Sequence, residues 1–420
     1  MTKISWIIPV VVAILVLATI LILPSHKNQI KNAKPLVFID TPRSGERVYG
    51  VVILSGRSKD PDGKVKVVEV KVDDGEWEQA HGTLNWSFYV DTRDLENGWH
   101  TIYVRSFDGH LYSEIARISL LIENEIITDV HRWGLFVAVA NVEDIETKLG
   151  NGMLNLAEDM ARYFISNLGY PASHITILFD DGWIRDEKGE RICTLQDRVN
   201  RIDYVTYGPA TKDYLVRSIE RLKEEANKYR DSEVFIWISG HGVGEEGRIG
   251  RKLIGRSEVV LWDSTITDRE LGDLLDDLKA ELCLIVDACY SGEFANRLIF
   301  GIPSILKSGI PRDGRIVITG ESRFSKGYAS TISGPLFTRL WFEGLKTGKA
   351  DGFKGGVLKL GRRTHLRFFR DGRVSVEEAF YYARCMIRKN YKEFILMQPQ
   401  INDCYPHRFP FNMGEMFLGD

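Results

Sequence analysis

ELCLIVDACYSG, residues 281–292, contains an apolar run that is followed by an aspartate, Asp287, and a cysteine, Cys289. The residues before Asp287 form a nearly continuous apolar run, which is typical of a strand that is buried on both faces of a parallel sheet. Cys289 follows Asp287 by two residues. A carboxylate tends to raise the pKa of a nearby thiol and is costly to dehydrate. We therefore expect Asp287 to have a function.

Apolar runs of the same kind recur through residues 132–420 and alternate with helical patterns. The strand-like runs are WGLFVAVA (133–140), HITILF (174–179), EVFIWIS (233–239), ELCLIVD (281–287) and GRIVITG (314–320). The helical stretches include NLAEDMARYFISNL (155–168), KDYLVRSIERLKEEANKY (212–229) and DRELGDLLDDL (268–278). Capping boxes, Thr267 with Glu270 and Ser375 with Glu378, mark two helix starts. This alternation predicts an α/β domain with a mainly parallel sheet and helices on both faces.

A histidine and a cysteine follow two of the predicted strands directly. His241 lies in SGHGVG (239–244) and Cys289 lies in DACYSG (287–292). Because functional groups gather at the carboxyl ends of parallel strands, we expect the two side chains to share one edge of the sheet. A histidine and a cysteine are the minimum for nucleophilic catalysis by a thiol. The imidazole accepts the thiol proton, and the thiolate attacks a carbonyl. The backbone N–H groups of Gly242 and Cys289 are suited to bind the resulting oxyanion.

These motifs resemble those of the caspase and legumain clan of cysteine peptidases, with legumain-like and metacaspase-like members the most similar. The resemblance covers roughly residues 132–410 and includes, in order, SGHG (239–242), DACYSG (287–292), GPLFTRLWFEGL (334–345), VSVEEAFYYAR (374–384) and QPQINDCYP (398–406). It implies a caspase-like fold, a catalytic dyad of His241 and Cys289, and an oxyanion hole formed by the Gly242 and Cys289 backbone groups. It also implies a thioester acyl-enzyme.

The resemblance implies substrate-binding roles for three acids. Two residues along a strand return to the same side, so Asp287 and Cys289 should face one cleft. Metacaspase-like relatives line the primary specificity pocket with an acid at this position, and the region after the first predicted strand adds Glu143 and Asp144. An unpaired carboxylate favours a cationic substrate, so we predict cleavage after arginine, then lysine, with Lys148 as a partial counter-charge and asparagine specificity as the alternative. A purely structural Asp287 that accepts backbone hydrogen bonds is the other interpretation.

The first third of the chain has a different character. Residues 4–23 form an uncharged apolar run that is long enough to cross a bilayer, and we predict an uncleaved membrane anchor there, followed by a linker over 24–35. Residues 36–123 alternate short β-patterned runs with turns and resemble immunoglobulin-like modules of surface proteins. A hinge over 124–131 leads to the peptidase-like domain at 132–420. This order predicts a single-pass membrane protein whose catalytic domain is extracytoplasmic.

The composition argues against several other classes of protein. The formal net charge is -3 and the basic residues are scattered, which argues against a nucleic-acid partner. The 5 cysteines are far apart and do not form a zinc-like pattern, so we predict no disulfide framework, no metal and no cofactor. A calcium requirement, known among relatives, stays open, as does the oligomeric state.

The sequence thus predicts a membrane-anchored cysteine endopeptidase that acts on peptide or protein substrates. Transpeptidation is an enzymatic alternative, because an amine can capture the thioester in place of water. An inactive surface protein used for binding or adhesion is the alternative of another class.

Overall fold

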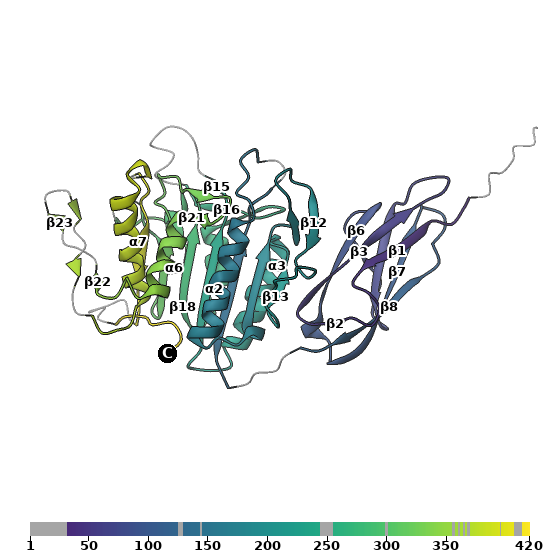
Figure 1. Ribbon diagram of the computed structural model, residues 1–420, viewed down its shortest axis with the longest axis horizontal. Helices are drawn as coiled ribbons and strands as arrows, with labels where there is room; N and C mark the ends of the chain where they lie inside the picture. Colours follow the sequence, from purple (N-terminus) through teal and green to yellow (C-terminus); the bar gives the residue numbers. More distant parts are fainter. Residues whose placement is uncertain are drawn as a thin grey trace, which may run out of the picture.

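The computed structural model describes residues 32–124, 129–142, 145–243, 255–298, 301–354, 370–394, 396–406 and 414–420, with the backbone of three short strands between 358 and 367. The predicted membrane anchor at 4–23 lies outside the described residues. Among the helices that are described, none is both long and apolar enough to cross a bilayer. Figure 1 shows two units, a β-sandwich domain near the N-terminus and an α/β domain beside it.

The sandwich domain buries its core between two sheets. In the described residues these sheets have the orders β1-β3-β6 and β2-β8-β7-β4-β5. The strands are β1 (Leu36–Thr41), β2 (Arg47–Val48), β3 (Val51–Lys59), β4 (Val67–Val72), β5 (Glu78–Gln79), β6 (Asn85–Asp91), β7 (Gly98–Phe107) and β8 (Ala116–Ile122). Alternate residues of β7, including Ile102 and Val104, point inward and pack with Trp86 and Leu54. The predicted β-sandwich is confirmed.

The α/β domain is organised around one sheet whose described strands have the order β13-β10-β9-β14-β18-β19-β26. All neighbouring pairs are parallel except β19 with β26. The strands are β9 (Arg132–Ala138), β10 (Ile175–Phe179), β13 (Thr206–Gly208), β14 (Glu233–Ser239), β18 (Glu281–Asp287), β19 (Arg315–Thr319) and β26 (Gln400–Asp403). The five predicted strands are β9, β10, β14, β18 and β19, so the mainly parallel sheet is confirmed.

Helices cover both faces of this sheet, as predicted. On one face α2 (Gly152–Leu168), α6 (Leu336–Thr347) and α7 (Val376–Asn390) lie side by side and share a core with alternate strand residues (Figure 1). On the other face α3 (Lys212–Ala226) and α5 (Asp268–Leu274) pack in the same way. Both predicted capping boxes are present, at the starts of α5 and α7.

Short elements decorate the edges of the α/β domain. Three antiparallel groups lie in this part of the chain: β11 (Trp183–Arg185) with β12 (Arg191–Thr194); β15 (Gly242–Val243) with β16 (Glu258–Val260) and β17 (Thr265–Thr267); and β20 (Ala329–Ser330) with β21 (Gly334–Pro335). The pairs β22 (Phe353–Lys354) with β25 (Leu366–Arg367) and β23 (Leu358–Lys359) with β24 (Arg362–Arg363) lie farther along. The 3-10 turns are η1 (Thr92–Asp94), η2 (Ala172–His174), η3 (Ser291–Ala295) and η4 (Lys392–Phe394).

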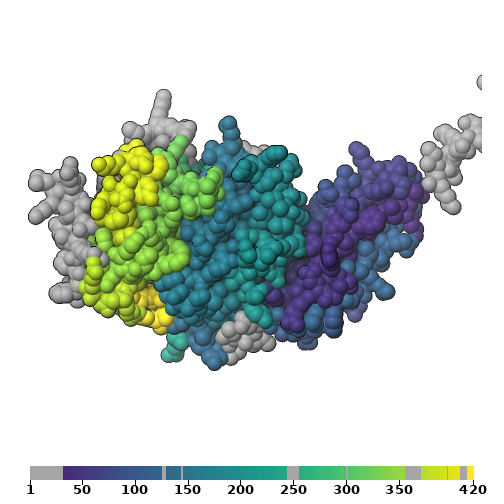
Figure 2. All heavy atoms as spheres, in the orientation of Figure 1, coloured from purple at the N-terminus to yellow at the C-terminus, as the bar shows by residue number. Residues whose placement is uncertain are grey.

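The two domains are in direct contact, and Figure 2 shows the sandwich against the segment of the α/β domain that contains β12 and β13. The Tyr89 hydroxyl donates to the Asp181 carbonyl oxygen at 2.5 Å. Gly50, at a φ of +66°, lies so close to Thr206 that an added Cβ would be 2.8 Å from its Oγ1. The sandwich therefore covers the β13 edge of the sheet, which would otherwise leave strand groups unpaired.

Candidate active site

His241 and Cys289 lie at matching positions beyond two adjacent strands. β14 pairs with β18 in a register that sets Ser239 opposite Asp287, and each candidate residue is two positions farther along. Both line a cavity of about 610 Å³ at the carboxyl end of the sheet. The structure therefore brings together the two side chains that the sequence predicted, although 48 positions separate them.

Gly242 fits between the two candidate residues because it has no side chain. A Cβ at this position would lie 1.8 Å from the Cys289 carbonyl oxygen and 2.9 Å from its nitrogen, so no other residue is accommodated without a shift. Val260 N–H donates to the His241 carbonyl oxygen at 2.8 Å, which makes Gly242 and Val259 a non-hydrogen-bonded pair of the β15–β16 ladder. The ladder therefore does not use the Gly242 N–H, which lies close to the Cys289 backbone.

The His241 ring is oriented by a backbone carbonyl. Nε2 is 2.8 Å from the Thr147 oxygen, and because a carbonyl only accepts hydrogen bonds, this nitrogen carries the proton. Burial lowers the pKa of His241, with the nearby Lys148 ammonium acting in the same direction and the Thr147 hydrogen bond opposing both. At neutral pH the imidazole is therefore uncharged, with Nδ1 as its basic nitrogen.

Cys289 is protonated in the same state. Burial raises the pKa of its thiol above the ordinary value, while the Gly327 N–H, which donates to Sγ at 3.3 Å, acts in the opposite direction. A neutral imidazole and a neutral thiol that line one cavity are a starting arrangement for general-base activation rather than a preformed ion pair.

Asp287 lies at the base of the same cavity with 4% of its surface exposed. Its Oδ2 accepts hydrogen bonds from the Thr338 N–H at 2.9 Å and from the Thr338 hydroxyl at 2.6 Å, at the start of α6. Burial raises the pKa of Asp287 to about 6, against the effect of these two hydrogen bonds. No arginine, lysine or histidine of the described residues forms an ion pair with it. The hydrogen bonds from Thr338 thus give a structural role to Oδ2 of Asp287. A role of Asp287 in substrate recognition stays a prediction.

Two of the predicted substrate-binding residues, Glu143 and Asp144, lie outside the described residues. Lys148, which was considered as a counter-charge for the pocket, donates from Nζ to the Val142 carbonyl oxygen. Sequence reasoning missed the backbone groups of Thr147 and Gly327, because a carbonyl or an amide contributes through geometry that no residue type announces.

Glu321 is a further buried acid that the sequence did not single out. It follows β19, has 0% exposure, and accepts from the Gln398 N–H at 3.1 Å through Oε2. Its Oε1 has no hydrogen-bond partner in the described part of the chain. Burial raises the pKa of Glu321 well above its ordinary value, and the Asp287 charge acts in the same direction. Two buried carboxyl groups with raised pKa values thus lie near Cys289, and Lys326 lines the same cavity.

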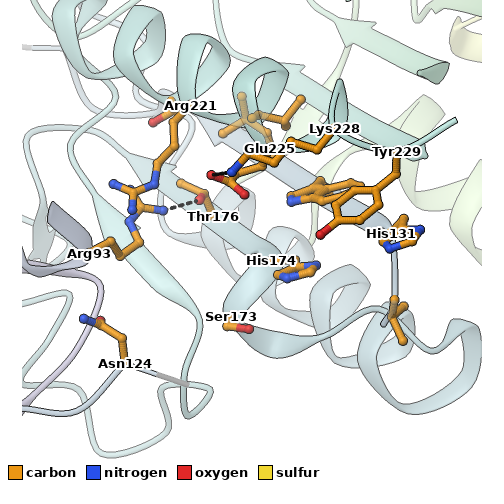
Figure 3. A pocket seen from close by; sticks show the side chains of 16 residues that line it. Arg93, Asn124, His131, Ser173, His174, Thr176, Arg221, Glu225, Lys228 and Tyr229 are labelled. Carbon is orange, nitrogen blue, oxygen red and sulfur yellow. Dashed lines mark hydrogen bonds and ion pairs between the residues drawn. The ribbon is translucent and has the colours of Figure 1, made fainter. Parts of the chain in front are cut away.

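A second cavity, of about 460 Å³, lies at the other end of the strands and is shown in Figure 3. It lies between the two domains, with Arg93 on the sandwich side and a stack of rings on the other. The His131 and Tyr229 ring centroids are 3.6 Å apart. Arg93 and Arg221 are both paired with Asp91. Ser173 and His131 also line this cavity, but Nδ1 of His131 is 2.8 Å from the Asp231 carboxylate, and we assign the cavity to the interface.

The described residues contain no group of three or more His, Cys, Asp or Glu side chains arranged to hold a metal ion. All five cysteines are free thiols, and Cys283 is fully buried in the core.

Comparison with known proteins identifies part of the chain. Residues 35–104 match a family model described as a bacterial Ig domain. The endo-beta-1,4-mannanase from Thermotoga petrophila is similar at 18% identity and a TM-score of 0.20, over 22% of this chain and 20% of that one, so this chain spans about a fifth of its length. The fibronectin(III)-like modules of Clostridium thermocellum CbhA are similar at 22% identity and a TM-score of 0.19, over 21% and 97%.

Caspase-1 from Spodoptera frugiperda is similar over a longer stretch. The identity is 12% and the TM-score 0.36, with 64% of this chain and 85% of that chain covered. The search of curated proteins returns no significant match. The family match supports an immunoglobulin-like sandwich domain, whereas the description of the α/β domain rests on its own strand order and site.

Proposed function

We propose that the chain is a cysteine endopeptidase in which His241 and Cys289 form the catalytic dyad. The observation that carries the proposal is the shared cavity at the carboxyl end of the sheet, where the two residues follow adjacent strands in register. The close approach of Gly242 to the Cys289 backbone is the second support, because an oxyanion hole formed by the Gly242 and Cys289 N–H groups requires these two backbone segments to be neighbours.

The proposed reaction uses the neutral resting state. His241 accepts the thiol proton of Cys289 as Sγ attacks the carbonyl carbon of the scissile bond, and the Gly242 and Cys289 N–H groups bind the developing oxyanion. The imidazolium then donates that proton to the leaving amine, which breaks the peptide bond and leaves a thioester. Water, activated by the same imidazole, hydrolyses the thioester and regenerates the thiol.

The proposed specificity is for arginine and then lysine before the scissile bond. Asp287 lines the cavity next to Cys289 and forms no ion pair among the described residues. A guanidinium offers two parallel hydrogen bonds to a carboxylate and would supply the missing positive charge.

The test is hydrolysis of fluorogenic peptides that differ only in the residue before the scissile bond, using residues 32–420. We expect the arginine peptide to be cleaved fastest and the Cys289→Ala variant to lose activity by at least about a thousandfold. Cys385→Ala is the matched control, because this thiol lies on α7 away from the cavity. Equal rates for the wild type and Cys289→Ala would remove the enzyme proposal. Faster cleavage after asparagine would replace the specificity, and capture of an added amine would identify transpeptidation.

We also propose an extracytoplasmic, membrane-attached location, which rests on the apolar run at 4–23 and the immunoglobulin-like domain that follows it. Protease added to intact cells should release the α/β domain. Protection until lysis would reverse this assignment.

A further inference from the structure

Asp180 and the loop after β9 form a hydrogen-bonded unit beneath the candidate site. Asp180 is fully buried at the end of β10, with a φ of +41°. Its Oδ1 accepts from the Ala140 N–H at 2.7 Å and from the Asn141 N–H at 3.3 Å. Its Oδ2 accepts from the Asn141 side-chain amide at 2.7 Å. Three donors from two consecutive residues thus converge on one carboxylate.

The later part of this segment, residues 145–149, lines the candidate site and returns to Ala140. Leu149 N–H donates to the Ala140 carbonyl oxygen at 2.8 Å, so Ala140 is fixed through its N–H by Asp180 and through its carbonyl by the far end of the loop. Thr147, two residues before that closure, provides the carbonyl oxygen that accepts the His241 Nε2 proton. Ile145, Thr147 and Leu149 all line the cavity of the candidate site.

We infer that Asp180 is a positioning residue for the dyad, because it holds the loop whose Thr147 carbonyl fixes the tautomer and orientation of His241. The inference rests on the proposed function of His241 and Cys289. Asp180 touches neither residue and takes no part in proton transfer. Its role is to keep the Thr147 oxygen within hydrogen-bond distance of Nε2, so that Nδ1 remains the basic nitrogen.

The neighbouring Asp181 has a different set of partners, which makes it a natural control. Asp181 is also buried, but its carboxylate binds Arg185 at 2.6 Å and Arg191 at 2.6 Å, and it makes no hydrogen bond to the described residues of the loop after β9. Loss of this carboxylate should leave two arginines of the α/β domain without their shared partner and should not move Thr147.

The experiment compares Asp180→Asn with Asp181→Asn in the full-length protein. The amide in Asp180→Asn would turn donor hydrogens toward the Asn141 donors, so kcat for the arginine peptide should fall about tenfold to a hundredfold, with a smaller change in KM. Adding Asn141→Asp to Asp180→Asn exchanges donor and acceptor across this contact and should restore at least part of kcat. Asp181→Asn should keep kcat within about twofold.

A second readout separates this inference from the proposed function. The rate of Cys289 alkylation by iodoacetamide, followed against pH by mass spectrometry, reports how His241 influences the thiol without any peptide substrate. Asp180→Asn should shift this profile and Asp181→Asn should not. An unchanged profile and unchanged kcat in folded Asp180→Asn would overturn the inference while hydrolysis by the wild type upheld the function. If the wild type cleaves no peptide, the proposed function fails. If the alkylation profile of Asp180→Asn still differs from that of the wild type, the positioning role of Asp180 stands.

Discussion

The candidate active site and the domain interface handle buried acids in opposite ways. At the interface, burial acts to raise the pKa of Asp181, but the hydrogen bonds and charges of Arg185 and Arg191 hold it below its ordinary value. In the active site the carboxyl groups of Asp287 and Glu321 keep their raised pKa values, because burial is opposed there only by neutral hydrogen-bond donors. The buried acid at the interface is thus paired with arginines, whereas the buried acids of the candidate active site are not.

This difference distinguishes structural from functional charge. A buried acid that is matched by arginines contributes to the folded state and needs nothing more. A buried acid that lines a cavity beside a thiol and forms no ion pair within the described residues lowers the stability of the empty protein and is retained where a ligand supplies the charge. The comparison therefore supports a cationic substrate side chain more directly than the sequence motif does.

The largest expected effect comes from neutralising the unmatched acid. Asp287→Asn should lower kcat/KM for the arginine peptide by about a hundredfold to a thousandfold, because a charge-assisted contact becomes a neutral one. Cleavage of an asparagine peptide, measured in parallel, should change much less. Because Thr338 can still donate to the amide oxygen, the thermal midpoint should not fall. Undiminished hydrolysis of the arginine peptide by this variant would show that Asp287 does not read the substrate.

The next largest effect concerns stability at the interface. Asp181→Asn leaves Arg185 and Arg191 without their shared carboxylate, and Arg185 is only 6% exposed. Breaking a buried pair from one side should lower the free energy of unfolding by about 3 kcal/mol, measured by urea denaturation. The kcat of the folded variant should stay close to that of the wild type. A variant as stable as the wild type would mean that these arginines find other partners.

The pH dependence of stability should also differ in sign between the regions. The folded pKa of Asp287 is raised from 3.8 to about 6, so the folded state binds more protons between these values and loses stability as the pH rises through them. Relative to wild type, Asp287→Asn should therefore gain about 2 kcal/mol between pH 4 and pH 7. The folded pKa of Asp181 is lowered, so its contribution is present above about pH 4 and is lost on further acidification. Parallel curves for wild type and Asp287→Asn would contradict the burial argument.

The sequence predicted the centre of the fold better than its edges. The strands β9, β10, β14, β18 and β19 are continuous apolar runs, since both their faces are buried, and such runs are recognisable without a structure. The edge strands β13 and β26 are short and mixed in composition, so their pairing depends on packing between distant segments. The capping boxes were predictable because their hydrogen bonds are local.

The candidate site divides along the same line. His241 and Cys289 were predictable because each follows a recognisable strand, and parallel strands end at one edge. Thr147 and Asp180 were not, because a carbonyl that orients a ring and a carboxylate that holds a loop depend on contacts between residues far apart in sequence. The Thr338 partner of Asp287, 51 residues away, had no sequence signal either.

The smallest expected effect lies at the exposed rim of the interface. Arg221 on α3 contacts Asp91 at 3.4 Å, where Arg93 is the closer partner at 2.7 Å. It also pairs with Asp94 of the sandwich at 2.9 Å, but its side chain is 30% exposed and that of Asp94 is 73% exposed. Solvent screens such a pair, so Arg221→Gln should lower the free energy of unfolding by less than about 1 kcal/mol, and the difference should shrink further in 1 M salt. Asp181→Asn should keep most of its deficit in the same salt, because a buried pair is screened much less. Urea titrations of both variants at low and high salt measure the contrast. A large loss of unfolding free energy in Arg221→Gln that persists in high salt would contradict this prediction. It would mean that the ion pair contributes more to the coupling of the two domains than its exposure indicates.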